Sequence, residues 1–389
     1  MKNNLTKRLW SLFVMIFLGV NLVDAQTITV GNVTANPGDN ILVPINFTNM
    51  NNIGAIKLYI LYDSQVLTFN GITNLVPEGA GTLANGMTNP ARVGIAWSAS
   101  TQGVDFPNGK YLDLQFTFIG GSTALDFTNA CEIADWDANI LNVTFVDGSV
   151  SAPAVTFNLT VLLEGAYIPG SGGTMYTSLQ SSGLLPLSQP YSPSLPYYGN
   201  ANPAWLYQGT ENVTNLPPNV VDWVVVELRD AVTASQATSA TVVARKACLL
   251  LSNGLIRELN GTTIPTFYTS FSQGAFVVIW HRNHLGIMSA TPVAGISGNY
   301  TYNFTTGSGQ VYGGSTGYKS LDSGKWGMVS GDINADKNVN SSDKTSGWNI
   351  DAAKNGYIGT DTNTNGQVNN PDKNNFLLTN YSKVSGVPN

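Results

Sequence analysis

Apolar side chains occupy every second position in several stretches of the first part of the chain, notably 41–47, 56–62 and 112–118. A two-residue period buries one face of a strand and leaves the other face in water, which is typical of antiparallel sheets. Turn-forming segments rich in Asn, Pro and Gly, such as Asn36–Asp39, separate these stretches. The pattern predicts a β-sandwich over residues 26–152.

The composition excludes several classes of protein. Apolar residues make up 43% of the chain and charged residues only 11%, which is too apolar for a disordered chain. With 18 Lys and Arg against 24 Asp and Glu, the chain lacks the cationic surplus that neutralises phosphates, so we expect no nucleic-acid partner. The two cysteines, Cys131 and Cys248, are expected in different domains, which excludes a disulfide framework.

Residues 1–25 have the pattern of a cleaved export signal. A basic start precedes the apolar run Leu9–Val20, and small residues lead to a predicted cut before Gln26. The run is shorter than the ~20 residues that span a bilayer, so we expect no membrane span after cleavage. The mature chain would carry 15 basic and 23 acidic residues, a net charge of −8 that favours cation binding. We expect a secreted protein, extracellular or at the cell surface.

The first predicted domain, residues 26–152, resembles the cohesin family. The motifs that carry the resemblance are Val33–Asp39, Val43–Ile45, Leu58–Asp63, Val66–Leu67, Gly109–Phe118 and Val146–Val150. The resemblance implies a jelly-roll sandwich, related to carbohydrate-binding modules, that binds dockerin partners through one sheet face.

Residues 153–327 are predicted to form a second β-sandwich, a central β-rich module. Val155–Leu163 alternates, and the strand candidates Val220–Leu228 and Ala275–Trp280 are rich in branched and aromatic residues. This part resembles an uncharacterised region of adhesin-like secreted bacterial proteins, through Val221–Asp230 and His281–His284. That resemblance implies no particular chemistry.

The last part of the chain, residues 328–389, contains a duplicated pattern of Asp and Asn. Two loops, 29 residues apart, have oxygen-bearing side chains at positions 1, 3, 5, 7 and 12. Calcium prefers six to eight oxygen ligands, and such a loop supplies side chains from positions 1, 3, 5 and 12 and a carbonyl from position 7. We therefore predict two Ca²⁺ sites. Their candidate residues are Asp332, Asn334, Asp336, Asn338 and Asp343, then Asp361, Asn363, Asn365, Gln367 and Asp372.

Both loops resemble dockerin repeats, in which one helix follows each calcium loop. The resemblance implies a small α-helical domain with helices at Lys344–Lys354 and Lys373–Lys383. Position 6 of the first loop is Lys337, where Gly is expected for a positive φ, so we expect this site to be weaker or distorted. Because dockerins bind cohesins, the expected partners are cohesin or dockerin modules of other secreted proteins.

Catalysis is not predicted. The two histidines, His281 and His284, lack an evident third zinc ligand, although Asp222, Glu227 or Asp230 could approach them across a sheet. We find no nucleophile elbow or phosphate-binding loop. We therefore expect no catalytic residues, and a hydrolase centred on the two histidines is the least favoured hypothesis.

The leading hypothesis is a mainly β, secreted, non-catalytic modular protein that acts in extracellular assembly or adhesion through cohesin and dockerin contacts. The alternative is a carbohydrate-binding accessory protein of a polysaccharide-degrading system. It would bind polysaccharide through exposed aromatic residues such as Trp97, Trp136 or Trp205.

Overall fold

The computed structural model describes residues 25–75, 83–88, 91–191 and 207–389. The predicted export signal therefore lies outside the described residues except for Ala25, and so does Trp205. The described chain is mainly β, with 42% strand and 12% helix, which confirms that part of the predicted fold class. Among the described residues, every helix is too short or too polar to serve as a membrane span.

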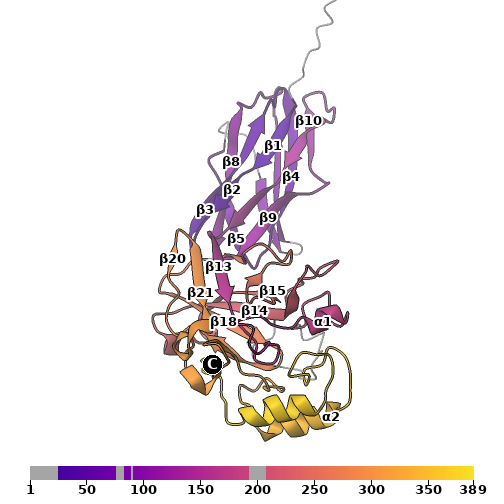
Figure 1. Cartoon of the computed structure of the whole chain (residues 1–389). Coiled ribbons are helices and arrows are strands. Elements are labelled where there is room, and N and C mark those ends of the chain that lie inside the picture. Colours follow the sequence, from indigo (N-terminus) through magenta and orange to yellow (C-terminus); the bar gives the residue numbers. More distant parts are fainter. Residues whose placement is uncertain (1–24, 76–82, 89–90, 192–206) are drawn as a thin grey trace, which may run out of the picture.

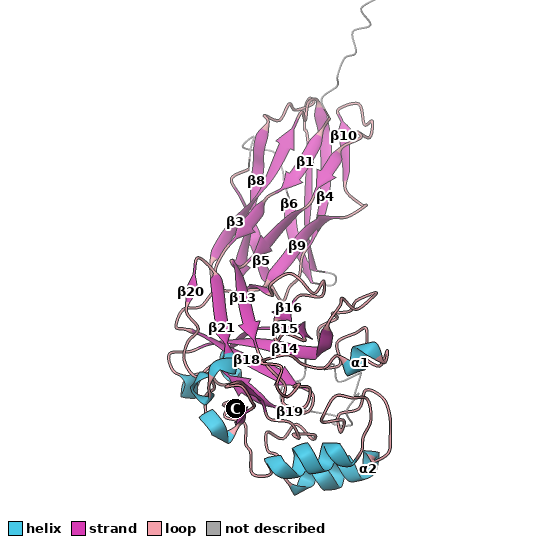
Figure 2. Cartoon of the chain, viewed as in Figure 1, coloured by secondary structure: helices cyan, strands magenta, loops and turns pink. Residues whose placement is uncertain are grey.

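The first part of the chain is a sandwich of two sheets (Figures 1 and 2). Its strands are β1 (Thr27–Val30), β2 (Asn32–Thr34), β3 (Asn40–Thr48), β4 (Ile53–Leu61), β5 (Leu67–Thr73), β6 (Leu83–Thr88), β7 (Ala91–Ser98), β8 (Gly109–Phe118), β9 (Ser122–Phe127), β10 (Glu132–Asp135), β11 (Thr144–Val146) and β12 (Gly148–Ser151). One sheet has the order β11-β1-β3-β8-β5. The other has the order β2-β12-β9-β4-β7-β6, with β10 paired to β4.

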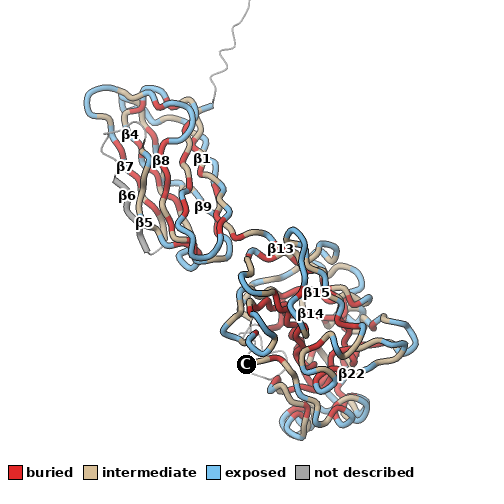
Figure 3. Tube along the Cα trace, turned by 90° about the vertical axis from the view of Figure 1, so that its left-hand side faces the viewer, coloured by how far each residue is buried: buried red, intermediate tan, exposed pale blue. Residues whose placement is uncertain are grey.

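The alternation seen in the sequence places the core of this sandwich. Ile41, Val43, Ile45 and Phe47 of β3 are buried, and the residues between them, Leu42, Pro44 and Asn46, are exposed or partly exposed. Figure 3 shows buried and more exposed residues alternating along the strands of the sandwich. Phe47 stacks on Tyr111 of β8 with ring centroids 4.3 Å apart. The buried side chains of both sheets form one cluster, so the predicted sandwich is confirmed over this region.

The central part contains two larger sheets and a two-stranded ribbon. Its elements are β13 (Ala154–Thr160), α1 (Ser178–Ser181), β14 (Val220–Asp230), β15 (Val242–Leu251), β16 (Ile256–Arg257), β17 (Thr266–Tyr268), β18 (Ala275–His281), β19 (His284–Met288), β20 (Gly295–Ile296), β21 (Asn299–Asn303), β22 (Tyr318–Ser320) and β23 (Trp326–Met328). Short helical turns lie at η1 (Ala234–Gln236), η2 (Ser239–Thr241), η3 (Phe304–Thr306), η4 (Ser308–Gln310) and η5 (Gly314–Thr316). The sheets have the orders β17-β13-β21-β20, β16-β15-β14-β18-β19 and β22-β23.

Strand β14 is buried on both faces, which explains its unbroken apolar sequence. On one face, Val224 and Val226 pack with Phe157 of the neighbouring sheet. On the other face, Trp223 belongs to a cluster that contains Tyr357 and Val387 from the last part of the chain. The C-terminal segment thus covers the second face of the central sheet.

Two helical segments, 341–351 and 370–380, follow the predicted calcium loops. They contain η6 (Asp343–Trp348) with α2 (Asn349–Asp351), and η7 (Asp372–Leu377) with η8 (Leu378–Asn380). Each begins and ends three residues before the predicted helix. Position 12 of each loop already lies in the first turn, and Ala353 and Ser382 end the helical paths with φ of 72° and 76°.

Candidate functional site

The two predicted calcium loops follow the same backbone path. At position 4, Ala335 and Thr364 have φ of 54° and 56°, and at position 6, Lys337 and Gly366 have φ of 72° and 85°. A positive φ at position 6 is easy for Gly and unfavourable for other residues. Lys337 nevertheless adopts it, so the two loops share this turn, and a weaker first site remains a prediction.

The carboxylates at positions 1 and 12 join distant parts of each loop. Asp361, at position 1, accepts hydrogen bonds from the backbone N–H groups of Asn365 at 3.0 Å and Gly366 at 2.8 Å. Asp372, at position 12, accepts from the N–H groups of Asn363 at 3.1 Å and Asn369 at 2.8 Å. These bonds close the second loop on itself.

The first loop is closed in the same way. Asp343 accepts hydrogen bonds from the N–H groups of Ile333 and Asn340, both at 2.8 Å. Asn334, at position 3, accepts from the N–H of Asp336 at 3.1 Å, and Asp336 accepts from the N–H of Asn338 at 2.9 Å. The first loop therefore gathers its own predicted ligand residues.

Positions 3 and 5 of the second loop repeat these short-range bonds. Asn363 accepts from the N–H of Asn365 at 3.1 Å, and Asn365 accepts from the N–H of Gln367 at 2.8 Å. Gln367, at position 7, is exposed, and the spacing predicts that this position contributes its backbone carbonyl.

Burial makes the carboxylates of both loops unusually basic. It raises the pKa of Asp332 well above its ordinary value, and repulsion from Asp343 and Asp336 adds to the effect. Burial likewise raises the pKa of Asp361 to about 6, and raises those of Asp343 and Asp372. A cation placed in either loop would neutralise these buried negative charges.

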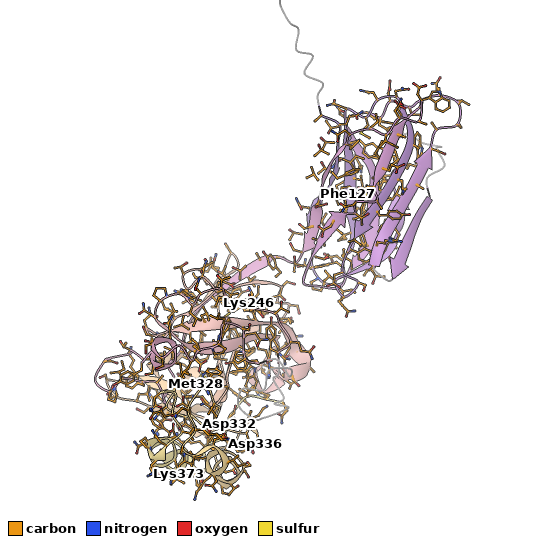
Figure 4. All side chains as sticks on the ribbon, turned by 90° about the vertical axis from the view of Figure 1, so that its right-hand side faces the viewer. Phe127, Lys246, Met328, Asp332, Asp336 and Lys373 are labelled. Carbon is orange, nitrogen blue, oxygen red and sulfur yellow. The ribbon has the colours of Figure 1, made fainter. Side chains whose placement is uncertain are left out.

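The side chain of Asp332 has an unused acceptor. Its Oδ1 atom is buried and has no hydrogen-bond partner among the described residues, and the same holds for Asn369 Oδ1. Figure 4 labels Asp332 and Asp336, which lie next to the helical segments. Across the same residues, His, Cys, Asp and Glu side chains do not gather in threes as a metal site. An ion here would therefore also need Asn side chains and backbone carbonyls, which is the mixed oxygen set that calcium accepts.

A buried ion pair fastens the second loop to the central sheet. Asp222, in β14, receives Nε of Arg282 at 2.9 Å and the hydroxyl of Tyr357 at 2.7 Å. The Oδ2 atom of Asp222, which accepts from Arg282, also lies 3.2 Å from Nε2 of His281. Burial alone would raise the pKa of Asp222, but Arg282 and His281 more than offset it and hold that pKa well below its usual range.

The turn between β18 and β19 holds the backbone that leads into the second loop. Asn283 donates from Nδ2 to the carbonyls of Gly359 at 3.0 Å and Asp361 at 2.7 Å. Arg282 donates to the carbonyl of Ile358. The sequence did suggest that Asp222 could approach the histidines, but it did not reveal that Arg282 and Tyr357 share this carboxylate.

A second network holds the end of the second helical segment. Glu164 accepts from Asn380 Nδ2 at 2.7 Å and from the N–H of Ser330 at 3.0 Å, and it also pairs with Lys319. Asn380 Nδ2 donates further to the carbonyl of Ser330 at 2.8 Å. Both networks join residues predicted to lie in separate domains.

The two histidines are structural partners in this arrangement. Nδ1 of His281 lies 3.0 Å from Nδ1 of His284, and His284 Nε2 accepts from the N–H of Gly165 at 3.2 Å. These hydrogen bonds are compatible with two neutral imidazole rings. Because His284 accepts at Nε2, its proton is assigned to Nδ1. Each histidine is only 2% exposed, so neither ring is open to a substrate.

The other two carboxylates considered as zinc ligands lie elsewhere. Glu227 pairs with Arg229 and Arg245. Asp230 accepts backbone N–H groups of the turn at residues 272–274. Of the three carboxylates considered as zinc ligands, only Asp222 lies next to the histidines.

The aromatic residues proposed for sugar binding have different environments. Trp97 is 3% exposed and packs in the sandwich core against Phe106, with ring centroids 5.1 Å apart, so its expected exposure is wrong. Trp136 is 43% exposed, and Trp205 lies outside the described residues. Trp136 is the one member of the set that the structure places at the surface.

Acidification is expected to destabilise the fold through the two histidines. Burial lowers the pKa of His281 and, more strongly, of His284. Below the unfolded pKa of about 6.5, the unfolded chain then binds more protons than the folded chain. Stability is therefore retained above about pH 6.5 and lost below it, by up to ~1.4 kcal/mol per pH unit for each ring. Urea unfolding between about pH 7.5 and 5.5, in saturating calcium, measures this slope.

The matched variant for this prediction is His284→Gln. The Gln carbonyl can still accept a hydrogen bond, but the side chain does not titrate. We expect a shallower loss of stability with acid, and equal slopes for the two proteins would contradict the assignment.

Comparison with known families identifies the sandwich. Residues 26–152 match the family described as "Cohesin domain". This segment, about a third of the chain, is therefore a cohesin domain, and cohesin domains are non-catalytic interaction modules. A comparison with curated proteins finds no match to the chain.

Several solved cohesins are similar to this chain. A non-cellulosomal cohesin from the archaeon Archaeoglobus fulgidus has 22% identity and a TM-score of 0.30, over 33% of this chain and 91% of that one. A cohesin from Clostridium acetobutylicum has 23% identity and a TM-score of 0.30, over 33% and 90%. A type I cohesin–dockerin complex from Clostridium thermocellum has 20% identity and a TM-score of 0.31, over 33% and 100%.

Proposed function

We propose that this protein is a secreted, non-catalytic module of extracellular assembly whose cohesin domain binds a dockerin of another protein. The observation that carries the proposal is the family match over residues 26–152, because cohesin domains bind dockerin modules. The match coincides with a complete two-sheet sandwich. A place outside the cell or at its surface agrees with the cohesin domains of scaffoldins and with the predicted export signal.

Within the sandwich, the outer face of β4 and β7 is the better candidate for the dockerin surface. Tyr59 lies there with the guanidinium of Arg92 4.7 Å from its ring centroid, and exposed Lys57 is next to Glu132. Tyr and Arg are the residues most enriched among binding hot spots. The outer face of the other sheet contains hydroxyl and amide side chains such as Thr29 and Asn46, together with exposed Leu42 and Val146, and it lacks a comparable Tyr–Arg pair among the described contacts. We therefore assign the contact to Tyr59 and Arg92.

Binding of the full-length protein to a panel of purified dockerins tests the proposed dockerin binding and the assignment of the contact to Tyr59 and Arg92. The wild type should bind at least one dockerin when calcium is present. Tyr59→Ala and Arg92→Ala should each weaken that binding about tenfold or more, as hot-spot truncations do. Biolayer interferometry with the full chain immobilised gives the dissociation constants.

The matched control for this experiment is the pair Thr29→Ala and Asn46→Ala on the opposite sheet. These variants should bind like the wild type. Loss of binding in the controls, with binding intact in the Tyr59 and Arg92 variants, would indicate that dockerin binds the other face. Failure of the wild type to bind any dockerin would overturn the proposed function.

We further propose that each C-terminal loop binds one Ca²⁺. The proposed ligands are Asp332, Asn334, Asp336, Asn338 and Asp343 in the first loop, and Asp361, Asn363, Asn365, Gln367 and Asp372 in the second, with position 7 acting through its carbonyl. The unpartnered Oδ1 of Asp332 and the raised pKa values of the buried carboxylates support this. The ion would supply positive charge that offsets these carboxylates and ties each loop to its helix.

The role of the calcium follows from the two buried networks. Because Asp222, Arg282 and Asn283 hold the second loop, and Glu164 holds Asn380, the loops are joined to the central sheet. We propose that calcium stabilises residues 153–389 as one unit, on which the cohesin domain is presented.

A further inference from the structure

A cavity of about 170 Å³ lies between the central sheet, the first loop and the last residues of the chain. Arg229 of β14, Arg245 of β15 and Trp280 of β18 contribute the sheet side. Lys337 contributes from position 6 of the first loop, and Ser239, Pro388 and Asn389 complete the lining. The cavity lies outside the cohesin domain, and its lining includes Lys337 of the first loop but none of the predicted calcium ligands.

The charge around this cavity is positive. Arg229 and Arg245 share one carboxylate, Glu227, with Arg229 Nε 2.7 Å from Oε1 and Arg245 Nε on the other oxygen. Lys337 adds a third cation, and Asp332 is the other carboxylate that acts on Lys337. The lining thus contains three cationic side chains, two of which share a single carboxylate, in a chain whose formal net charge is −6.

Several cationic donors at the cavity have no acceptor. Within the described part of the chain, Arg245 donates only from Nε, so both of its terminal nitrogens lack a protein partner. Arg229 is 1% exposed and uses Nη1 on the carbonyls of Ala237 and Pro388, while its Nη2 has no partner in the same residues. A guanidinium group presents paired N–H donors that match the oxygens of carboxylate, phosphate or sulfate.

Lys337 is directed to this cavity by the backbone. Its Nζ donates to Asn389 Oδ1 at 2.6 Å and lies 5.7 Å from the Trp280 ring centroid. A Gly at position 6 would suit the positive φ better but would supply no charge. The presence of Lys at a position that favours Gly is explained if its ammonium group has a role in the cavity.

We propose that this cavity binds a small oxyanion, through the free guanidinium nitrogens of Arg229 and Arg245 and the ammonium group of Lys337. The volume corresponds to roughly five or six water molecules, so the ligand is a group the size of acetate or inorganic phosphate, or the terminal carboxylate, sulfate or phosphate of a larger molecule. The ordered donors would replace the hydration of the anion, and the anion would offset a buried cation that burial disfavours.

Calorimetric titration of the full-length protein tests the proposal. Sodium acetate and sodium phosphate are titrated separately, in calcium-free and in calcium-containing buffer where solubility permits, with sodium chloride as the reference at equal ionic strength. We expect saturable one-to-one binding of at least one of the two anions, and none of chloride. The acetate and phosphate arms distinguish a carboxylate ligand from a phosphate or sulfate ligand.

Variants assign the binding to this cavity. Arg245→Gln and Lys337→Met should each weaken binding about tenfold or more, because they remove charged donors that face the ligand. Lys325→Met, which removes a lysine from a different cavity, should leave the affinity unchanged. Thermal unfolding confirms that each variant is folded, and Arg245→Gln keeps the test valid if Lys337→Met disturbs the loop. Absence of saturable binding in the wild type, or unchanged affinity in folded Arg245→Gln, would overturn the proposal.

Discussion

Chelation of calcium is expected to release residues 328–389 from the central sheet of the full-length protein. A ligand at a hundredfold excess over its dissociation constant adds ~2.7 kcal/mol to the free energy of unfolding, so loss of two ions should remove about 5 kcal/mol. Tyr357 and Val387 belong to the same buried cluster as Trp223, so faster amide hydrogen exchange should extend to β14. Hydrogen exchange measured by mass spectrometry, in calcium and in excess chelator, locates the change.

The cohesin domain serves as the internal control for this experiment. Its core is a separate cluster from those of the central module, so its peptides should exchange at the same rate in both buffers. Asp372→Asn should reproduce part of the effect in calcium, whereas Asp137→Asn, an exposed carboxylate of the sandwich, should not. Equal exchange of residues 328–389 with and without calcium would contradict the proposed role of the ions.

Asp222→Ala is expected to destabilise the protein by about 3–5 kcal/mol. The substitution leaves the guanidinium group of Arg282 buried without its carboxylate, and removal of one partner from a buried ion pair typically has this effect. The hydroxyl of Tyr357 loses its acceptor at the same time. Urea unfolding monitored by tryptophan fluorescence measures the change in the free energy of unfolding.

A surface ion pair provides the matched control. Lys354 Nζ and Asp351 Oδ1 lie 2.7 Å apart at the end of the first helical segment, and Asp351→Ala should cost less than about 1 kcal/mol. The double variant Asp222→Ala with Arg282→Met should recover part of the loss, because it no longer leaves a charge buried alone. If Asp222→Ala were no more destabilising than Asp351→Ala, the buried network would not hold the C-terminal segment.

Many strands of this protein could be predicted because a two-residue period needs no knowledge of distant contacts. The alternating run from Ile41 to Phe47 became β3, whereas β14 was predicted from its branched and aromatic residues. The same reasoning, applied to Val93, Ile95 and Trp97, would have placed Trp97 in the core. That error came from considering the indole as a binding surface before considering its place in the alternation.

The position of the C-terminal segment could not be predicted, because its contacts join residues far apart in the chain. Asp222 and Tyr357 are 135 residues apart, and Glu164 and Asn380 are 216 apart. A signal was nevertheless present, since Asp222 lies among apolar residues of a strand, and a buried charge requires a partner. The sequence indicates that such a partner exists, but only the fold identifies Arg282.

The helices after the proposed calcium loops were predictable in position but not in their bounds. The repeated offsets predict the candidate ligands, and each helix begins three residues early because position 12 belongs to its first turn. The left-handed conformation of Lys337 was also unexpected. Its side chain lines a cavity with Arg229 of β14 and Arg245 of β15, which no local pattern describes.

Native mass spectrometry of the full-length protein tests most directly whether calcium holds the C-terminal segment on the central sheet. The protein should retain two Ca²⁺ ions per chain, and the double variant Asp361→Asn with Asp372→Asn should retain one and show faster hydrogen exchange around Tyr357. A wild-type chain that carries no calcium at saturating concentrations, or a metal-free chain with undiminished protection there, would contradict this account.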